Sequence, residues 1–170
     1  DKITFFKSKR YLCVIFYIIS GFIFLTLIPY IGSTFQPKLV LGIFILTWTN
    51  DTFAYLIGKK FGKRKLKEKI SPKKTIEGFI GGLLAALIGG VIIFNTTLLY
   101  SPAFWLLLAL LVSVLGTTGD LIQSKFKRLA GVKDSGRIMP GHGGVYDRLD
   151  SIIFASPFIY LFIIFINYVS

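Results

Sequence analysis

The sequence predicts an all-α, polytopic integral membrane protein with about five transmembrane helices and two basic cytoplasmic loops. Of the 170 residues, 54% are hydrophobic and 16% are charged, and the mean hydropathy is +0.70. A soluble domain of this size is about a quarter charged. The apolar residues gather in five runs, each near the length of about 20 residues at which a helix crosses a bilayer core. This composition excludes a soluble enzyme and a soluble nucleic-acid-binding protein.

The five runs differ in character. They cover residues 11–31, 39–57, 76–98, 102–122 and 151–169. The first and last are typical of lipid-facing spans, since neither contains a charge. The third predicts a central, packed helix, because small residues let helix backbones approach closely; its glycines are Gly78, Gly81, Gly82, Gly89 and Gly90. The second and fourth each contain an aspartate, which is costly inside a membrane and therefore indicates a function.

The basic residues predict the orientation. All of the 20 Lys and Arg residues except Lys38 lie in three segments: the amino-terminal segment, the loop after the second run, and residues 123–150. The positive-inside rule places these three segments in the cytoplasm and the carboxyl terminus outside. For residues 59–69, an equally good interpretation is that they only set this topology and contact anionic lipid headgroups.

Four of the eight acidic residues lie within or against the runs, near one predicted cytoplasmic plane: Asp51, Asp120, Asp147 and Asp150. Carboxylates gather at low dielectric when a cation holds them or when some are protonated. A site built from carboxylates, with one histidine in the chain, favours Mg²⁺ over zinc. Taken singly, Asp51 could instead bond a neighbouring helix or a lysine. Asp147 and Asp150, three residues apart and on one face if the last helix begins there, could be a helix-start pair favoured by the dipole.

Two polar segments indicate phosphate binding. Ser71, Pro72, Lys73, Lys74 and Thr75 stand immediately before the glycine-rich run, where a helix amino terminus attracts anions. Residues 123–150 combine six cations with five glycines and the one histidine, His142. Such a backbone can cradle a polyphosphate, and with carboxylate-held Mg²⁺ it predicts nucleoside triphosphate chemistry at the membrane surface. The alternative for His142 is a turn residue between two glycines.

These residues resemble a known signature. In order and spacing, residues 124–150 are similar to the signature of the phosphatidate cytidylyltransferases, the CDP-diacylglycerol synthases. The matching positions are Ser124, Lys127, Arg128, Lys133, Asp134, Gly136, Pro140, His142, Gly143, Gly144, Asp147, Arg148 and Asp150. The upstream pieces NDTFAYLIGKKFGK and SPKKTIEGFIGG also resemble the family.

The resemblance implies that CTP and phosphatidic acid react, with Mg²⁺, to give CDP-diacylglycerol and pyrophosphate. It implies Asp120 and Asp147 as metal ligands, with Asp150 and Asp51 as further candidates. Asp120, Asp147, Asp150, Lys127 and Arg128 are the expected catalytic residues. The expected substrate-binding residues are Lys73, Lys74, Thr75, Ser124, Lys133, His142, Gly143, Gly144 and Arg148.

The resemblance also bears on the whole protein. Family members are usually longer at the amino terminus, and the chain starts at Asp1, so residues 1–170 are expected to be one transmembrane catalytic domain from the carboxyl-terminal part of a longer chain. A homodimer in a bacterial inner membrane, with the active site facing the cytoplasm and no nucleic-acid partner, is expected. Two alternatives stay open: a CTP-dependent kinase of a lipid alcohol, and an ion-coupled transporter that uses the intramembrane aspartates.

Overall fold

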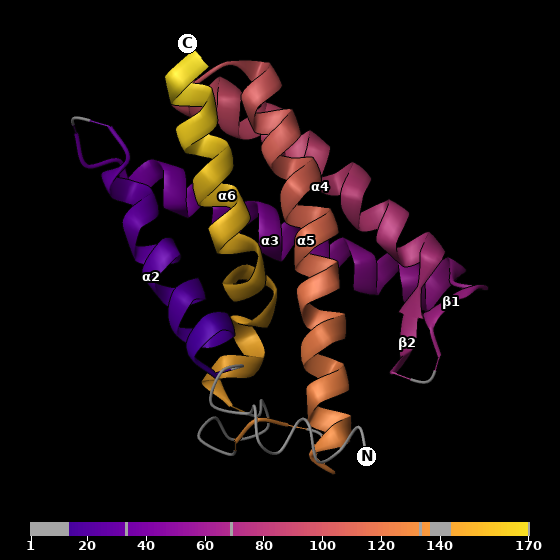
Figure 1. Cartoon of the computed structure of the whole chain (residues 1–170). Helices are drawn as coiled ribbons and strands as arrows, with labels where there is room; N and C mark the ends of the chain where they lie inside the picture. Colours follow the sequence, from indigo (N-terminus) through magenta and orange to yellow (C-terminus); the bar gives the residue numbers. More distant parts are fainter. Residues whose placement is uncertain (1–13, 33, 69, 133, 137–143, 170) are drawn as a thin grey trace.

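The computed structural model describes residues 14–32, 34–68, 70–132, 134–136 and 144–169. A π-helical turn, η1 (Val14–Ile19), leads into α2 (Ser20–Leu27) and a 3-10 turn, η2 (Ile28–Tyr30). Long helices follow: α3 (Pro37–Phe61), α4 (Ile76–Thr97), α5 (Pro102–Leu129) and α6 (Asp150–Val169). Figure 1 shows these helices as one bundle, with α6 between α2 and α5.

The predicted fold class is confirmed: the chain is an all-α, polytopic membrane protein. Among the described residues, four helices are long and apolar enough to cross a membrane, and they correspond to the second through fifth predicted runs. The first predicted run forms a shorter apolar helix over Phe16–Tyr30, and its residues 11–13 lie outside the described part of the chain.

Local signals explain where the helices begin. Pro37 and Pro102 stand in the first turns of α3 and α5, where a missing backbone N–H costs nothing. Ser101 caps α5, because its side chain accepts a hydrogen bond from Phe104 N at 3.2 Å.

Helix α5 is longer than its apolar run. Residues 123–129 were expected to belong to a loop, but α5 continues to Leu129. An apolar run ends at the membrane boundary, whereas a helix ends where the backbone leaves the helical conformation, here near Gly131 with φ +71°. Ser124, Lys127 and Arg128 therefore stand on a helix and not in a loop.

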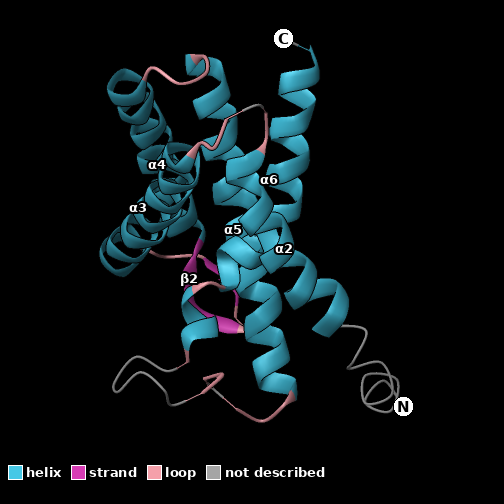
Figure 2. Ribbon diagram, turned by 90° about the vertical axis from the view of Figure 1, so that its left-hand side faces the viewer, coloured by secondary structure: helices cyan, strands magenta, loops and turns pink. Residues whose placement is uncertain are grey.

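A small hairpin joins α3 to α4, and the sequence interpretation did not predict it. Strands β1 (Lys65–Lys67) and β2 (Ser71–Thr75) pair antiparallel, with Lys65 opposite Thr75 and Lys67 opposite Ser71. Figures 1 and 2 show the hairpin at the end of α3 and α4 that is far from the C-terminus. The basic loop that was predicted after the second apolar run thus contains a folded element.

The glycines of α4 allow the close packing that the sequence predicts. A Cβ atom at Gly82 would lie 2.6 Å from the carbonyl oxygen of Asn50 on α3. A Cβ atom at Gly90 would lie 2.9 Å from the carbonyl oxygen of Trp105 on α5. Helix α4 therefore contacts both neighbours through backbone.

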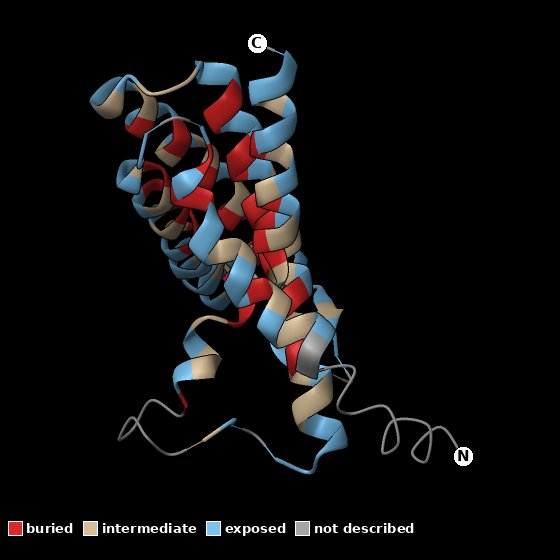
Figure 3. Cartoon of the chain, turned by 60° about the vertical axis from the view of Figure 1, so that its left-hand side comes forward, coloured by how far each residue is buried: buried red, intermediate tan, exposed pale blue. Residues whose placement is uncertain are grey.

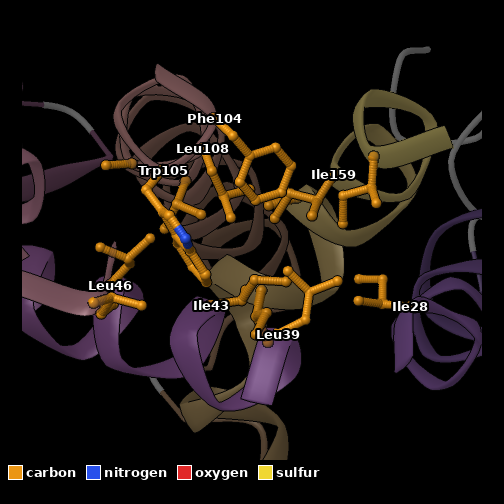
Figure 4. Packing of buried hydrophobic residues seen from close by; sticks show 14 of the residues in the cluster. Ile28, Leu39, Ile43, Leu46, Phe104, Trp105, Leu108 and Ile159 are labelled. Carbon is orange, nitrogen blue, oxygen red and sulfur yellow. The ribbon is translucent and has the colours of Figure 1, made fainter. Parts of the chain in front are cut away.

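The apolar core fills the half of the bundle opposite the hairpin. Leu39, Ile43, Trp105 and Ile159 are fully buried there and converge from three helices (Figure 4). The buried positions lie on inward faces, and the outward faces are exposed (Figure 3). Many exposed side chains are large and apolar, as expected for helices that contact lipid. This packing leaves the polar residues for the hairpin half.

Candidate active site

A cavity of about 730 Å³ opens in the hairpin half of the bundle, between α3, the hairpin, α5, a 3-10 turn η3 (Val145–Arg148) and the start of α6. Nine of the residues that the sequence singled out line it: Asp51, Lys73, Lys74, Thr75, Asp120, Lys127, Asp147, Arg148 and Asp150. These residues come from segments far apart in the sequence. The fold thus gathers the two polar segments and the intramembrane aspartates around one space.

Lysines pair with two of the four carboxylates. Lys74 on β2 forms an ion pair with Asp120 on α5, and both side chains are about a third exposed or less. Lys127 on α5 forms an ion pair with Asp147 in η3, with Nζ 2.9 Å from Oδ1. Each pair joins two elements across the cavity.

Asp147 is the most extensively hydrogen-bonded of the four. Its Oδ2 accepts bonds from the backbone N–H groups of Ser135 at 2.8 Å and Gly144 at 3.0 Å. Burial raises the pKa of this carboxyl, but the Lys127 ammonium and the two backbone donors outweigh that effect and lower the pKa to about 2. Asp147 is therefore ionised at every physiological pH.

The remaining two carboxylates bond locally. Asp150 Oδ1 accepts from Ser151 N at 2.8 Å and from Ser151 Oγ at 3.3 Å. Asp51 Oδ1 accepts from Asn50 Nδ2 at 3.2 Å. Both therefore keep acceptor capacity for another ligand.

One expected arrangement is wrong. Asp147 and Asp150 do not share a helix face, because α6 begins at Asp150 and Asp147 lies in the separate turn η3. The carboxylate of Asp147 caps the start of η3 through the backbone N–H of Gly144, and the break before α6 lies at Leu149, whose φ of −115° and ψ of 0° are not helical. Both carboxylates still line the cavity.

The donor set fits a hard cation in its chemistry. The four carboxylates around the cavity offer oxygen alone, which suits Mg²⁺. Within the described residues, no group of three or more His, Cys, Asp or Glu side chains is close enough to hold a metal ion. A metal at Asp120 or Asp147 would replace a lysine that now neutralises the carboxylate. The Mg²⁺ site stays a prediction.

Some of the predicted site residues do not line the cavity. Ser124 is not a lining residue, but its Oγ donates to the lining residue Asp120, at 3.2 Å from Oδ1. Arg128 donates to the carbonyl oxygen of Val132 at 3.4 Å, at the end of α5. Gly144 begins η3 and holds Asp147 through its N–H. Lys133, His142 and Gly143 lie outside the described residues.

The cavity also includes Trp48, which the sequence interpretation missed, and Tyr55, which it named only within the segment NDTFAYLIGKKFGK and not as a site residue. Trp48 and Tyr55 line it from α3, although they are 61% and 63% exposed. They stand three residues before and four after Asp51, which places all three on one helix face. Helical spacing around a costly intramembrane aspartate is the signal that could have identified them.

Comparison with known proteins gives consistent results. A family model described as "Cytidylyltransferase family" matches residues 3–166. A phosphatidate cytidylyltransferase of Staphylococcus saprophyticus is 40% identical over 166 residues, which are 96% of this chain and 62% of that protein. The phosphatidate cytidylyltransferases of Staphylococcus aureus (strain COL) and Bacillus subtilis (strain 168) are each 50% identical, over 74% and 68% of this chain. Those alignments cover 48% and 44% of the two relatives, so the chain spans about half the length of these curated proteins.

Proposed function

The chain belongs to the cytidylyltransferase family, and from that premise we propose that it transfers a cytidylyl group from CTP to phosphatidic acid, giving CDP-diacylglycerol and pyrophosphate. The observation that carries this proposal is that four carboxylates, and cations from three elements, line the same cavity. The relatives named phosphatidate cytidylyltransferase support the choice of substrates.

The reaction needs alignment more than proton transfer. A phosphate oxygen of phosphatidic acid attacks the α-phosphorus of CTP, a new P–O bond forms, and the bond from the α-phosphorus to the bridging oxygen of the β-phosphate breaks. Pyrophosphate leaves with the electron pair of that bond. Because the attacking oxygen is already ionised near neutral pH, no general base is required. Holding two anions in line and neutralising them accounts for the catalysis.

The cations of the cavity supply that neutralisation. Lys74 on β2 and Lys127 on α5 line it, and they pair with Asp120 and Asp147. Lys73 and Arg148 also line it. We assign these four side chains to the phosphates of the two substrates, where charge-assisted hydrogen bonds are strongest.

Asp120 and Asp147 are the proposed Mg²⁺ ligands, with Asp150 and Asp51 as further ligands at the same cavity. When bound, Mg²⁺ would neutralise charge on the reacting phosphates and on the pyrophosphate that leaves. Ser124 would orient Asp120, and the N–H groups of Ser135 and Gly144 would orient Asp147. Such supporting bonds fix a ligand's geometry.

The membrane setting follows from charge and exposure. The basic residues of the cavity half favour a cytoplasmic active site. The bacterial relatives favour a bacterial inner membrane. The exposed aromatic side chains Trp48 and Tyr55 form part of the cavity wall on α3. A phosphatidic acid molecule could therefore present its headgroup to the cavity while its acyl chains stay in lipid.

The homodimer implied by the family resemblance belongs to this proposal, and the mass of the protein–detergent complex tests it.

The test is an assay of the purified complete protein in detergent with labelled CTP, phosphatidic acid and Mg²⁺. We expect labelled CDP-diacylglycerol, its loss in EDTA, and its return when Mg²⁺ is restored in excess. No product from the complete protein would overturn the proposal. Phosphorylation of a lipid alcohol in a parallel reaction would then identify a kinase, and ion uptake by proteoliposomes would identify a transporter.

A further inference from the structure

The hairpin that carries Lys73 and Lys74 is fixed to the helices by one carboxylate. Glu77, in the first turn of α4, accepts hydrogen bonds from two backbone N–H groups that precede β1. Its Oε2 lies 3.0 Å from Lys63 N and 3.2 Å from Arg64 N, and its Oε1 lies 3.3 Å from Arg64 N. One side chain thus joins the start of α4 to the chain that enters the hairpin.

Two further contacts act at the same place. Ile76 N donates to the carbonyl oxygen of Arg64 at 2.9 Å, which extends the pairing of the two strands as far as α4. The Thr75 side chain lies against Gly62, where an added Cβ would come within 2.6 Å of Thr75 Cγ2. The end of β2 is therefore enclosed between α3 and α4.

This geometry decides where the lysines of β2 point. Thr75 ends β2 and begins α4 as its cap, with Oγ1 3.1 Å from Gly78 N. Lys74, directly before it, reaches across the cavity to Asp120 on α5. The neighbouring strand, β1, begins at Lys65, which pairs with Thr75. Any shift of the chain at Lys63 and Arg64 would therefore move Lys74 relative to α5.

We propose that Glu77 is a positioning residue for the phosphate-binding lysines: its bonds to Lys63 N and Arg64 N hold the hairpin so that Lys74 faces the substrate cavity. This inference rests on the proposed cytidylyl transfer. Glu77 does not line the cavity, so it acts through the hairpin and not on the substrate.

Three variants of the complete protein test the proposal: Glu77→Ala, Glu77→Gln and the control Glu68→Ala. Glu68 is an exposed acid in the turn of the same hairpin, so its removal changes the net charge equally. We expect Glu77→Ala to raise the KM for CTP about tenfold or more while kcat changes less. Glu77→Gln, which keeps an amide oxygen as acceptor, should recover most of that loss, and Glu68→Ala should stay within about twofold of the wild type. Equal KM values for wild type and Glu77→Ala would overturn the proposal.

A double-variant cycle with Lys74→Ala identifies the path of the effect. If Glu77 acts through Lys74, the double variant should lose no more kcat/KM than Lys74→Ala alone, within about threefold. Multiplied losses would show that Glu77 serves the fold in general and would contradict a positioning role.

Hydrogen exchange gives a readout that does not depend on turnover. In Glu77→Ala, the amides of Lys63 and Arg64 should exchange about tenfold faster than in the wild type, while those of α5 keep their protection. Unchanged protection at Lys63 and Arg64 would refute the proposed role of Glu77 in holding the hairpin, even if the protein catalysed another reaction. A different result would refute the proposed function: the wild type makes no CDP-diacylglycerol, but the amides exchange faster in Glu77→Ala. Glu77 would then hold the hairpin, but not for the binding of these substrates.

Discussion

Lys127 on α5 donates a hydrogen bond to Asp147 in η3, with Nζ 2.9 Å from Oδ1, although the two residues are 20 positions apart. The bond joins the start and the end of the polar segment that follows the membrane part of α5. Both side chains are largely shielded, at 16% and 11% exposed. A neutral side chain in place of either partner would leave the other charge shielded without its counter-ion, which is costly.

Asp147→Asn should abolish CTP-dependent product while expression and membrane insertion stay intact. The amide keeps the shape and one oxygen, but it removes the charge that binds Lys127 and that we assign to Mg²⁺. Turnover by the purified variant, compared with the exposed-site variant Glu68→Gln, is the measurement. Activity above about a tenth of the wild type would contradict the metal-ligand role.

The Asp147 pKa predicts how stability depends on pH. This pKa is lowered from an ordinary value of 3.8 to about 2, so the stabilisation from the ionised form is complete above pH 3.8 and is lost as the pH falls towards 2. The difference in thermal midpoint between wild type and Asp147→Asn should therefore be constant from pH 5 to 7 and shrink below about pH 4.

Lys127→Gln provides the control for this pH dependence. The hydrogen bond from Lys127 is the largest of the effects that lower the Asp147 pKa, so its loss should move the acid limb of the stability curve to higher pH. If the difference in thermal midpoint between the wild type and Asp147→Asn stayed constant down to pH 2, these donors would not be holding Asp147 ionised.

The long helices could be predicted because a membrane span must be apolar along its length. The hairpin could not. Its strands are rich in lysine and include Pro72, without the alternation of apolar and polar residues that marks a half-buried strand. Its stability depends on Glu77 and Ile76, which bond the backbone of residues more than ten positions earlier. Such pairing is visible only once α3 and α4 have packed.

The candidate site could also be predicted only in part from the sequence. Asp51 and Asp120 could be identified because a carboxylate in an apolar run is rare and costly. The partner of each carboxylate could not, since Lys73 and Lys74 are adjacent in sequence and only the register of β2 decides that Lys74 meets Asp120. Whether Asp147 lay on the last helix depended on the backbone of Leu149, which leaves the helical conformation between η3 and α6.

The packing of α4 predicts an unequal response of its glycines. Gly82→Ala should destabilise the protein by about 1–3 kcal/mol, because the added methyl would lie 2.6 Å from the rigid carbonyl oxygen of Asn50. Gly89→Ala on the same helix should have little effect, since its methyl would lie 3.5 Å from the flexible side chain of Leu46. Thermal unfolding in detergent measures both. Equal midpoints for the two variants would contradict the α3–α4 contact.

Lys73 and Lys74 allow a matched test of the proposed phosphate contacts. Both line the cavity from β2, but Lys73 is exposed, whereas Lys74 is half-buried and paired with Asp120. A charge interaction weakens as its surroundings become more aqueous, from about 4 kcal/mol for a contact at a protein surface to about 1 kcal/mol in bulk water.

Lys74→Met should therefore lower kcat/KM by about 10²–10³, the loss typical of removing one preorganised donor to a charged transition state. Lys73→Met should lower it by about fivefold or less, as expected for a solvated cation. The measurement is kcat/KM for CTP at fixed, saturating phosphatidic acid. Because the two variants remove the same charge from adjacent positions, a general change in membrane surface potential would affect them equally. If Lys73→Met lowered kcat/KM more than Lys74→Met did, the strand register that pairs Lys74 with Asp120 would not govern substrate binding.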